Sequence, residues 1–150
     1  MHSRLSSVKR ILKIDLEGTN AAFVWGPRQV GKTTLLNQQF PNAKVYDLLN
    51  TNLVTDLTLH PDHLRDDVLA NSYPLVIVDE VQKVPALLDE VHWLLENTKT
   101  KFIMCGSSAR KLRHGAANLL GGRAWRFELF PLTTKEIGTA REATTMSEIE

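Results

Sequence analysis

The feature that most constrains the fold is a glycine-framed loop that stands between two contrasting segments. The loop GPRQVGKT, residues 26–33, directly follows the apolar run AAFVW, residues 21–25. After the loop, Leu35, Leu36 and Phe40 recur at helical spacing. The sequence therefore predicts a buried strand, a glycine loop and a helix in immediate succession.

Further apolar runs and helical patterns alternate along the rest of the chain. The expected strands are residues 44–49, 74–80, 101–106 and 124–130, and further helices are expected after Pro61 and Pro85. The run 74–80, PLVIVDE, is continuously apolar before its two acids, as is typical of a central parallel strand. Strands that alternate with helices predict an α/β domain, with a parallel sheet that is covered on both faces.

The chain length of 150 residues corresponds to one domain with a real core. Apolar residues make up 43% and charged residues 23%, which excludes disordered and fibrous classes. We expect the domain to span residues 1–137, beginning with an amphipathic helix at 3–14 that packs onto it. Residues 138–150 are expected to be a polar tail or the start of a further element.

Nothing in the sequence indicates secretion or a membrane span. No apolar run approaches the ~20 residues that a span needs, and the basic start lacks the apolar core of a secretory signal. The single cysteine, Cys105, permits no internal disulfide, which fits the cytoplasm. We therefore expect a cytoplasmic protein without a membrane partner.

The loop at 26–33, called the phosphate loop below, fills every fixed position of G-x-x-x-x-G-K-[ST]. Glycines suit a loop that wraps a phosphate with its backbone N–H groups, and the following helix points its positive end at the same anion. Lys32 is expected to reach the β- and γ-phosphates, and the Thr33 hydroxyl to ligate Mg²⁺. The predicted nucleotide-binding residues are Gly26, Pro27, Arg28, Gln29, Val30, Gly31, Lys32, Thr33 and Thr34.

Two acids close the run at 74–80. Asp79 ends the expected strand, where its carboxylate can reach the Mg²⁺ through a water. Glu80 follows, and a carboxylate just beyond the strand end can polarise a water for in-line attack on the γ-phosphate. This pair predicts that the chain hydrolyses the nucleotide as well as binding it.

Two further groups are candidates for contact with the γ-phosphate. Ser107 and Ser108 follow the strand at 101–106, and a hydroxyl there could hold the attacking water or the γ-phosphate. Arg123 precedes the last strand and could stabilise the transferring phosphoryl group in its own or a neighbouring subunit. The competing arginines for that role are Arg110, Arg113 and Arg126.

The order of GPRQVGKTT, VIVDEVQ, CGSS, GGRAWRFEL and FPLTTKEI resembles the AAA+-type ATPase domain of a large prokaryotic family of predicted ATPases. The resemblance covers residues from about 4 to 137. It implies a P-loop NTPase three-layer sandwich whose five parallel strands have the order 5-1-4-3-2. It also implies that Ser107 is a polar sensor and that Arg123 is the arginine contact. In the family a further C-terminal domain usually follows, and these 150 residues do not include it.

The resulting prediction is a Mg²⁺-dependent ATPase domain that acts as a homo-oligomer or together with the missing C-terminal domain. ATP is preferred to GTP because the Asn-Lys-x-Asp guanine motif is absent from the sequence and because of the resemblance. One alternative is a nucleotide-gated switch with little turnover. Another is an ATPase stimulated by nucleic acid, through the stretch 97–127 whose only charged residues are basic. We expect most of that stretch to surround the nucleotide pocket.

Overall fold

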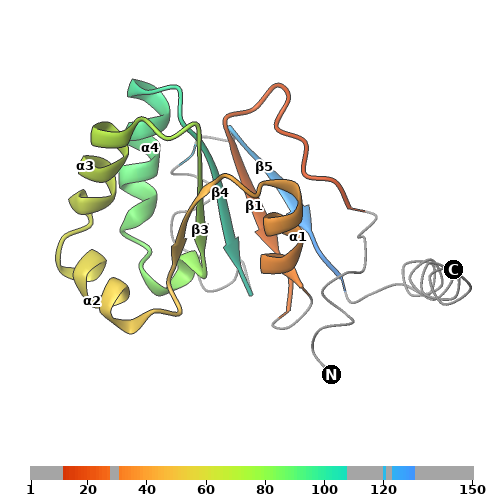
Figure 1. The fold of residues 1–150 in the computed structure, drawn as a ribbon, viewed down its shortest axis with the longest axis horizontal. Coiled ribbons are helices and arrows are strands. Elements are labelled where there is room, and N and C mark those ends of the chain that lie inside the picture. The colour runs from red at the N-terminus through yellow and green to blue at the C-terminus, as the bar shows by residue number, and fades with distance from the viewer. Residues whose placement is uncertain (1–11, 28–30, 108–119, 121–122, 131–150) are drawn as a thin grey trace, which may run out of the picture.

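The computed structural model describes residues 12–27, 31–107, 120 and 123–130. Within them, strands and helices alternate as the sequence predicts (Figure 1). The strands are β1 (Ala21–Trp25), β2 (Lys44–Asp47), β3 (Leu75–Asp79), β4 (Lys101–Gly106) and β5 (Ala124–Glu128). The helices are α1 (Lys32–Gln39), α2 (Thr51–Leu59), α3 (Asp62–Asn71) and α4 (Leu87–Asn97), with a short 3₁₀ helix η1 (Val81–Lys83) after β3.

All five strands are parallel and form one sheet in the order β2-β3-β4-β1-β5, which confirms the predicted topology. Strand β1 lies between β4 and β5, so that Val24 pairs with Cys105 on one side and with Phe127 on the other. Because the strands run in one direction, their ends form two opposite borders of the sheet. We call these the carboxyl edge, where the phosphate loop begins, and the amino edge.

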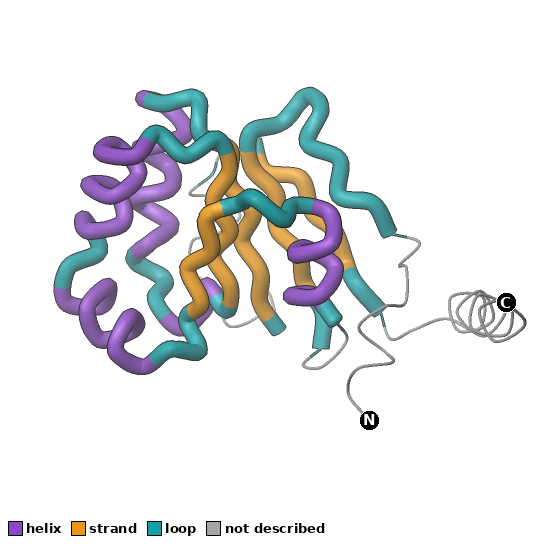
Figure 2. The backbone as a smooth tube through the Cα atoms, in the orientation of Figure 1, coloured by secondary structure: helices purple, strands orange, loops and turns teal. Residues whose placement is uncertain are grey.

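The helices lie on both faces of the sheet, as predicted (Figure 2). On one face α2, α3 and α4 cover the sheet, and on the other α1 packs with the N-terminal segment. The side chains of β3 point alternately to the two faces of the sheet. Val76 and Val78 pack in the core beneath α2, α3 and α4, and Ile77 packs in the core beneath α1. This double burial explains why β3 reads as a continuous apolar run.

One α-helix of the described residues, α2, was not predicted, and neither was the short helix η1. Helix α2 begins after Asn50, whose side-chain oxygen accepts hydrogen bonds from the backbone N–H groups of Asn52 and Leu53. Only Leu57 of this helix is buried, so the apolar periodicity that reveals a helix is weak there. The helix follows directly from β2, which ends at Asp47 and not at residue 49 as predicted.

The predicted helix at 3–14 is wrong over its last residues. Residues 12–14 are not helical, and Ile14 instead contributes its side chain to the α1 face of the core. Its backbone N–H donates to the side-chain oxygen of Gln39, at the end of α1. Residues 3–11 and the predicted tail at 138–150 lie outside the described residues. In the part of the chain that is described, none of the helices has the length and apolar character that crossing a membrane requires.

Candidate functional site

The phosphate loop leaves the sheet at the carboxyl edge, between β1 and α1. Gly31 adopts a left-handed conformation with φ 88°, which a glycine accepts without steric cost. The N–H of Gly26 donates to the carbonyl of Gly106 at 3.2 Å and thereby ties the start of the loop to the end of β4. Residues 28–30 of the loop lie outside the described residues.

Lys32 opens α1 and folds back over the loop. Its side chain is buried, and its ammonium donates to the carbonyl oxygens of Gly26 at 2.6 Å and Pro27 at 3.0 Å. The positive charge therefore lies against the backbone of the loop that is expected to wrap a phosphate. Thr34 is half-buried in the first turn of the same helix.

Thr33 and Asp79 meet although they are 46 residues apart in sequence. The Thr33 hydroxyl donates to Oδ2 of Asp79 at 3.0 Å. Burial raises the pKa of the Asp79 carboxyl, the nearby charges of Glu80 and Asp47 add to that rise, and the Thr33 hydrogen bond opposes it. Mg²⁺ prefers oxygen ligands, and one carboxylate and one hydroxyl oxygen converge here beside the loop, so these two residues fit a magnesium ion.

Glu80 follows β3 in a left-handed backbone conformation, with φ 58° and ψ 45°. For a residue with a Cβ this conformation costs about 1–2 kcal/mol. The turn places the Glu80 side chain in a buried position, where its Oε2 accepts a hydrogen bond from Nε2 of Gln82. Ser72, at the end of α3, is the other described non-glycine residue with a positive φ, whereas Glu80 carries the predicted catalytic carboxylate.

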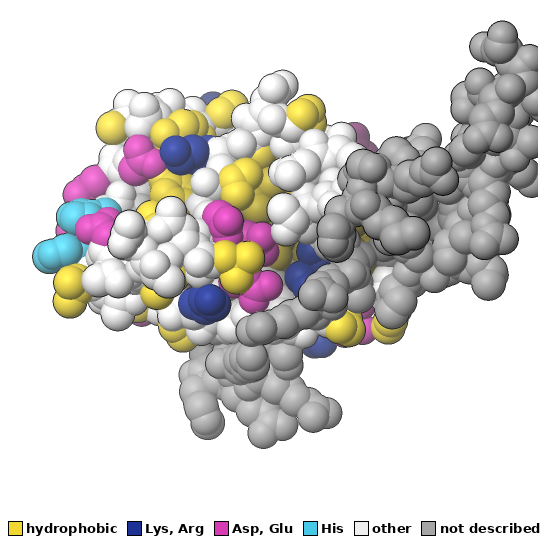
Figure 3. Space-filling view, turned by 60° about the horizontal axis from the view of Figure 1, so that its bottom comes forward, with side chains coloured by type: hydrophobic (Ala, Val, Ile, Leu, Met, Phe, Trp, Pro, Cys, Tyr) yellow, Lys and Arg dark blue, Asp and Glu magenta, His cyan; other side chains and the backbone are white. Residues whose placement is uncertain are grey.

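Ser107 lies at the end of β4 and also contacts Gln82. The Gln82 Nε2 is 3.4 Å from the Ser107 hydroxyl oxygen. The structure therefore brings five predicted residues to the carboxyl edge, namely Lys32, Thr33, Asp79, Glu80 and Ser107. Figure 3 shows this end of the molecule, where acidic side chains gather near the middle of the face with basic ones beside them.

Gln82 was not among the predicted site residues. The sequence contained its signal, because Gln82 belongs to the VIVDEVQ run that carries the family resemblance. Strand and helix patterns alone do not indicate that a glutamine two residues after the predicted catalytic carboxylate of Glu80 belongs to the site. Its link to Ser107, 25 positions away, emerges only in the folded chain.

Arg123 is not brought to the phosphate loop of its own chain, so of the two expected arrangements only a contact with a neighbouring subunit stays a prediction. It directly precedes β5, whose first residue pairs with the first residue of β1, so Arg123 lies at the amino edge. Five residues of strand, about 16 Å at ~3.3 Å per residue, separate it from the loop. Its guanidinium instead pairs with Glu96, the Nη1 and Oε1 atoms being 3.3 Å apart.

The competing arginines do not replace it. Arg126 lies on β5 and pairs with Glu128 at 2.8 Å. Arg110, Arg113 and the second serine, Ser108, lie outside the described residues.

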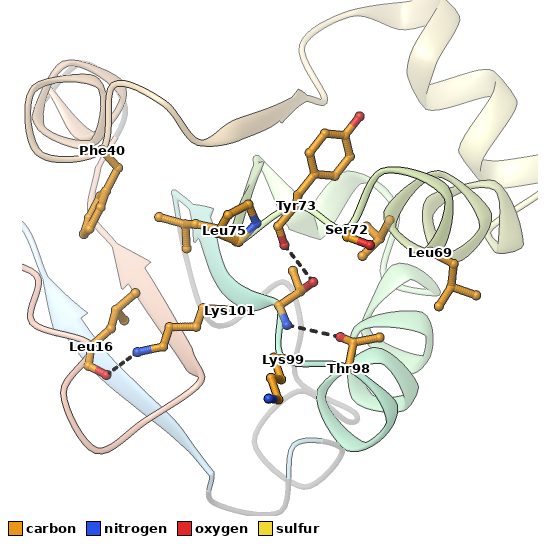
Figure 4. A pocket seen from close by; sticks show the side chains of 12 residues that line it. Leu16, Phe40, Leu69, Ser72, Tyr73, Leu75, Thr98, Lys99 and Lys101 are labelled. Carbon is orange, nitrogen blue, oxygen red and sulfur yellow. Dashed lines mark hydrogen bonds between the residues drawn. The ribbon is translucent and has the colours of Figure 1, made fainter.

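The described lysines of the basic stretch, Lys99 and Lys101, also lie at the amino edge and not beside the phosphate loop, and residues 108–119 of the stretch lie outside the described residues. Lys99 and Lys101 line a pocket of about 710 Å³ there, together with mostly apolar side chains that include Leu16, Phe40 and Leu75 (Figure 4). The Lys101 ammonium donates to the Leu16 carbonyl at 3.2 Å. This pocket is thus at the other end of the sheet from the phosphate loop.

Comparison with known proteins identifies a matching family. Residues 18–138 match the profile of a family described as an AAA domain. Among curated proteins, the chain is 33% identical over 119 residues to the uncharacterized protein Rv2008c of Mycobacterium tuberculosis. It is also 33% identical over 126 residues to the uncharacterized protein MJ1637 of Methanocaldococcus jannaschii. These matches cover 77% and 75% of this chain but only 26% of each relative. The chain thus spans about a quarter of the length of these relatives.

Two solved structures share the fold. One is the Walker-type ATPase PABY2304 of Pyrococcus abyssi, with a TM-score of 0.58 over 94% of this chain and 55% of that one. The other is AMPPCP-bound DnaA from Aquifex aeolicus, with a TM-score of 0.59 over 89% of this chain and 47% of that one. Both are 15% identical to this chain, so the likeness concerns the fold.

Proposed function

Because the chain belongs to the AAA domain family and has the fold of P-loop ATPases, we propose that it binds ATP with Mg²⁺ and hydrolyses the γ-phosphate. The observation that carries this proposal is the hydrogen bond between Thr33 and Asp79. It joins the end of the phosphate loop to the end of β3, directly beside the buried Glu80 carboxylate. An ATPase needs a phosphate cradle, metal ligands and a base at one point, and these residues supply all three.

Each residue of the carboxyl edge has a distinct role in this proposal. The backbone N–H groups of residues 26–33 surround the phosphates, and the Lys32 ammonium turns from the loop carbonyls toward the β- and γ-phosphate oxygens. Thr33 and Asp79 hold the Mg²⁺, which when bound supplies positive charge against those oxygens. Thr34 continues the first turn of α1 beside the phosphates.

Glu80 and Ser107 carry the hydrolytic step. A Glu80 carboxylate oxygen accepts a proton from water while the water oxygen attacks the γ-phosphorus. The bond from that phosphorus to its bridging oxygen breaks, and ADP leaves. The Ser107 hydroxyl donates to a γ-phosphate oxygen and so distinguishes ATP from ADP. If Arg123 contacts the γ-phosphate, it does so from a neighbouring subunit, because it lies at the amino edge of its own subunit.

The first test is the melting temperature of the 150-residue chain with and without Mg²⁺ and ATP. Ligand at ~100 times its dissociation constant adds about 2.7 kcal/mol of stability, a shift of several degrees for a domain of this size. Lys32→Ala should abolish the shift, and the matched control Lys83→Ala, an exposed lysine of η1, should retain it. A shift that survives in Lys32→Ala, or its absence from the wild-type chain, would contradict binding at the phosphate loop.

The second test separates hydrolysis from binding. Phosphate release should occur in the wild-type chain, and Glu80→Gln should keep the melting shift while losing release. A wild-type chain that binds ATP with Mg²⁺ and releases no phosphate over a range of protein concentrations would be a nucleotide-gated switch instead.

A further inference from the structure

Gln82 contacts two residues of the proposed catalytic site but has no role of its own in the proposed hydrolysis. Its side chain lies between two predicted catalytic groups, Glu80 on one side and Ser107 on the other. It comes from η1, the short helix that follows Glu80, whereas Ser107 directly follows β4. A single side chain therefore connects the ends of two neighbouring strands at the carboxyl edge.

The orientation of the Gln82 amide follows from its surroundings. Its Nε2 donates to a carboxylate oxygen of Glu80, and the reversed amide would set its own oxygen against that carboxylate. The Oε1 atom is consequently buried with no hydrogen-bond partner among the described residues. A buried oxygen without a partner is unfavourable, so the contacts of the nitrogen determine which way the amide points.

The second amide hydrogen has a consequence for Ser107. When Nε2 donates toward the Ser107 oxygen, that oxygen acts as an acceptor, and its own proton remains available to another group. A hydroxyl in this arrangement is prepared to donate to an anion. The same amide also fixes the Glu80 carboxylate, which must accept a proton from water.

Gly106 makes room for this arrangement. A Cβ at Gly106 would lie 2.5 Å from Gln82 Oε1 and 2.6 Å from Cζ3 of Trp25. Its backbone is not among the positive-φ glycines of the described residues, so the need for glycine comes from these two contacts. Trp25 is itself stacked on Phe23 with ring centroids 5.3 Å apart, which limits its freedom to move aside.

We propose that Gln82 is a positioning residue that holds the Glu80 carboxylate and the Ser107 hydroxyl in one hydrogen-bonded unit. In this unit the group that contacts the γ-phosphate is joined to the group that activates water. The inference deepens the proposed ATPase activity and rests on it for its catalytic consequence. The hydrogen-bonded unit itself is a property of the folded chain and is testable without any turnover.

The first experiment examines the unit directly by NMR. The side-chain NH₂ signals of Gln82 are assigned by their loss in Gln82→Met, a variant of similar length without the amide. These signals should be displaced from those of solvent-exposed glutamines, and both Glu80→Gln and Ser107→Ala should move them. Signals that neither variant moves would overturn the proposal, whether or not the chain hydrolyses ATP.

The second experiment measures kcat and KM for ATP hydrolysis by the 150-residue chain. Gln82→Met should lower kcat by about 10- to 100-fold, with KM within about two-fold of the wild-type value, because a misplaced catalytic group slows chemistry more than binding. The matched control Lys83→Met changes the adjacent, exposed side chain and should leave both constants unchanged. A Gln82→Met variant with wild-type kcat would refute the positioning role.

A third variant displaces Gln82 without removing it. Gly106→Ala should also lower kcat, since its Cβ pushes against the Gln82 oxygen. The combined loss in the double variant should be smaller than the product of the two single losses, because both substitutions disturb the same unit, although the contact of the new Cβ with Trp25 remains in the double variant. Fully multiplicative losses would show that Gly106 and Gln82 act separately and would contradict the arrangement proposed here. If the wild-type chain does not hydrolyse ATP, that result counts against the ATPase proposal. The NMR experiment would still decide whether Gln82, Glu80 and Ser107 form the hydrogen-bonded unit.

Discussion

Replacing Thr33 by valine removes one hydrogen bond from the buried Asp79 carboxylate and changes little else. Thr33 is exposed, and valine has nearly the same shape and a similar effect on a helix. The lost contact is the 3.0 Å bond from the Thr33 hydroxyl to Asp79, which is only 6% exposed. The variant therefore tests whether the predicted metal ligands also stabilise the fold.

The expected loss follows from the kind of bond that is removed. A hydrogen bond to a charged group contributes about 1.5–3 kcal/mol, and leaving a buried carboxylate with one hydrogen bond fewer is unfavourable. At ~2–4 °C per kcal/mol for a chain of this length, Thr33→Val should melt roughly 3 to 12 °C below the wild type at pH 7. The loss should shrink at lower pH, because the bond favours the ionised form of Asp79 and matters less once the carboxyl binds a proton.

The assay is thermal unfolding followed by circular dichroism, without Mg²⁺ and nucleotide, at several pH values between 7 and the raised pKa of Asp79. The double variant Thr33→Val with Asp79→Asn serves as the control, since the valine should cost less when no carboxylate is present. The reasoning fails if Thr33→Val melts with the wild type at pH 7, or if its loss is the same at every pH.

Three further substitutions test other parts of the structure. Asp79→Asn should raise the melting temperature at pH 7 yet abolish the Mg²⁺-dependent shift with ATP. Burial raises the pKa of Asp79 in the folded chain above 3.8, the ordinary value that applies in the unfolded chain, so the Asp79 carboxyl stabilises the fold less as the pH rises from 3.8 through the folded pKa. Leu64→Ala removes a fully buried side chain of α3 and should cost about 2–5 kcal/mol in chemical denaturation, whereas Leu59→Ala at a largely exposed position should stay within about 0.5 kcal/mol. Asn50→Ala deletes the cap of α2 and should lower the free energy of unfolding by about 1 kcal/mol, and an unchanged denaturation midpoint would show that the cap contributes nothing.

Sequence patterns predicted the central strands well because their burial is complete. Strands β1, β3 and β4 are covered on both faces, so their apolar runs are continuous and end where the chain leaves the sheet. The phosphate loop was equally clear, since its glycines and Lys32 occupy fixed positions. The order of the strands did not follow from these patterns and came from the family resemblance.

The misplaced elements depend on contacts that a linear pattern does not contain. The spacing of Leu5, Val8 and Leu12 suggested a helix through residue 14, but Ile14 packs against α1 in a segment without helical structure. Helix α2 has a recognisable cap at Asn50 and a nearly unburied body, so only its beginning could have been found. Arg123 was predicted as the arginine contact from the family resemblance, although a residue directly before a parallel strand must lie at the edge opposite the loop of its own chain.

The left-handed backbone of Glu80 has an evolutionary consequence. A glycine at this position would relieve about 1 kcal/mol or more of strain, and an asparagine would tolerate the same conformation better than glutamate does. Selection for thermal stability alone should therefore remove the glutamate from a library of variants at position 80. Selection for turnover should restore it. The residue at position 80 of a given family member would then indicate whether selection for stability or selection for turnover has dominated there.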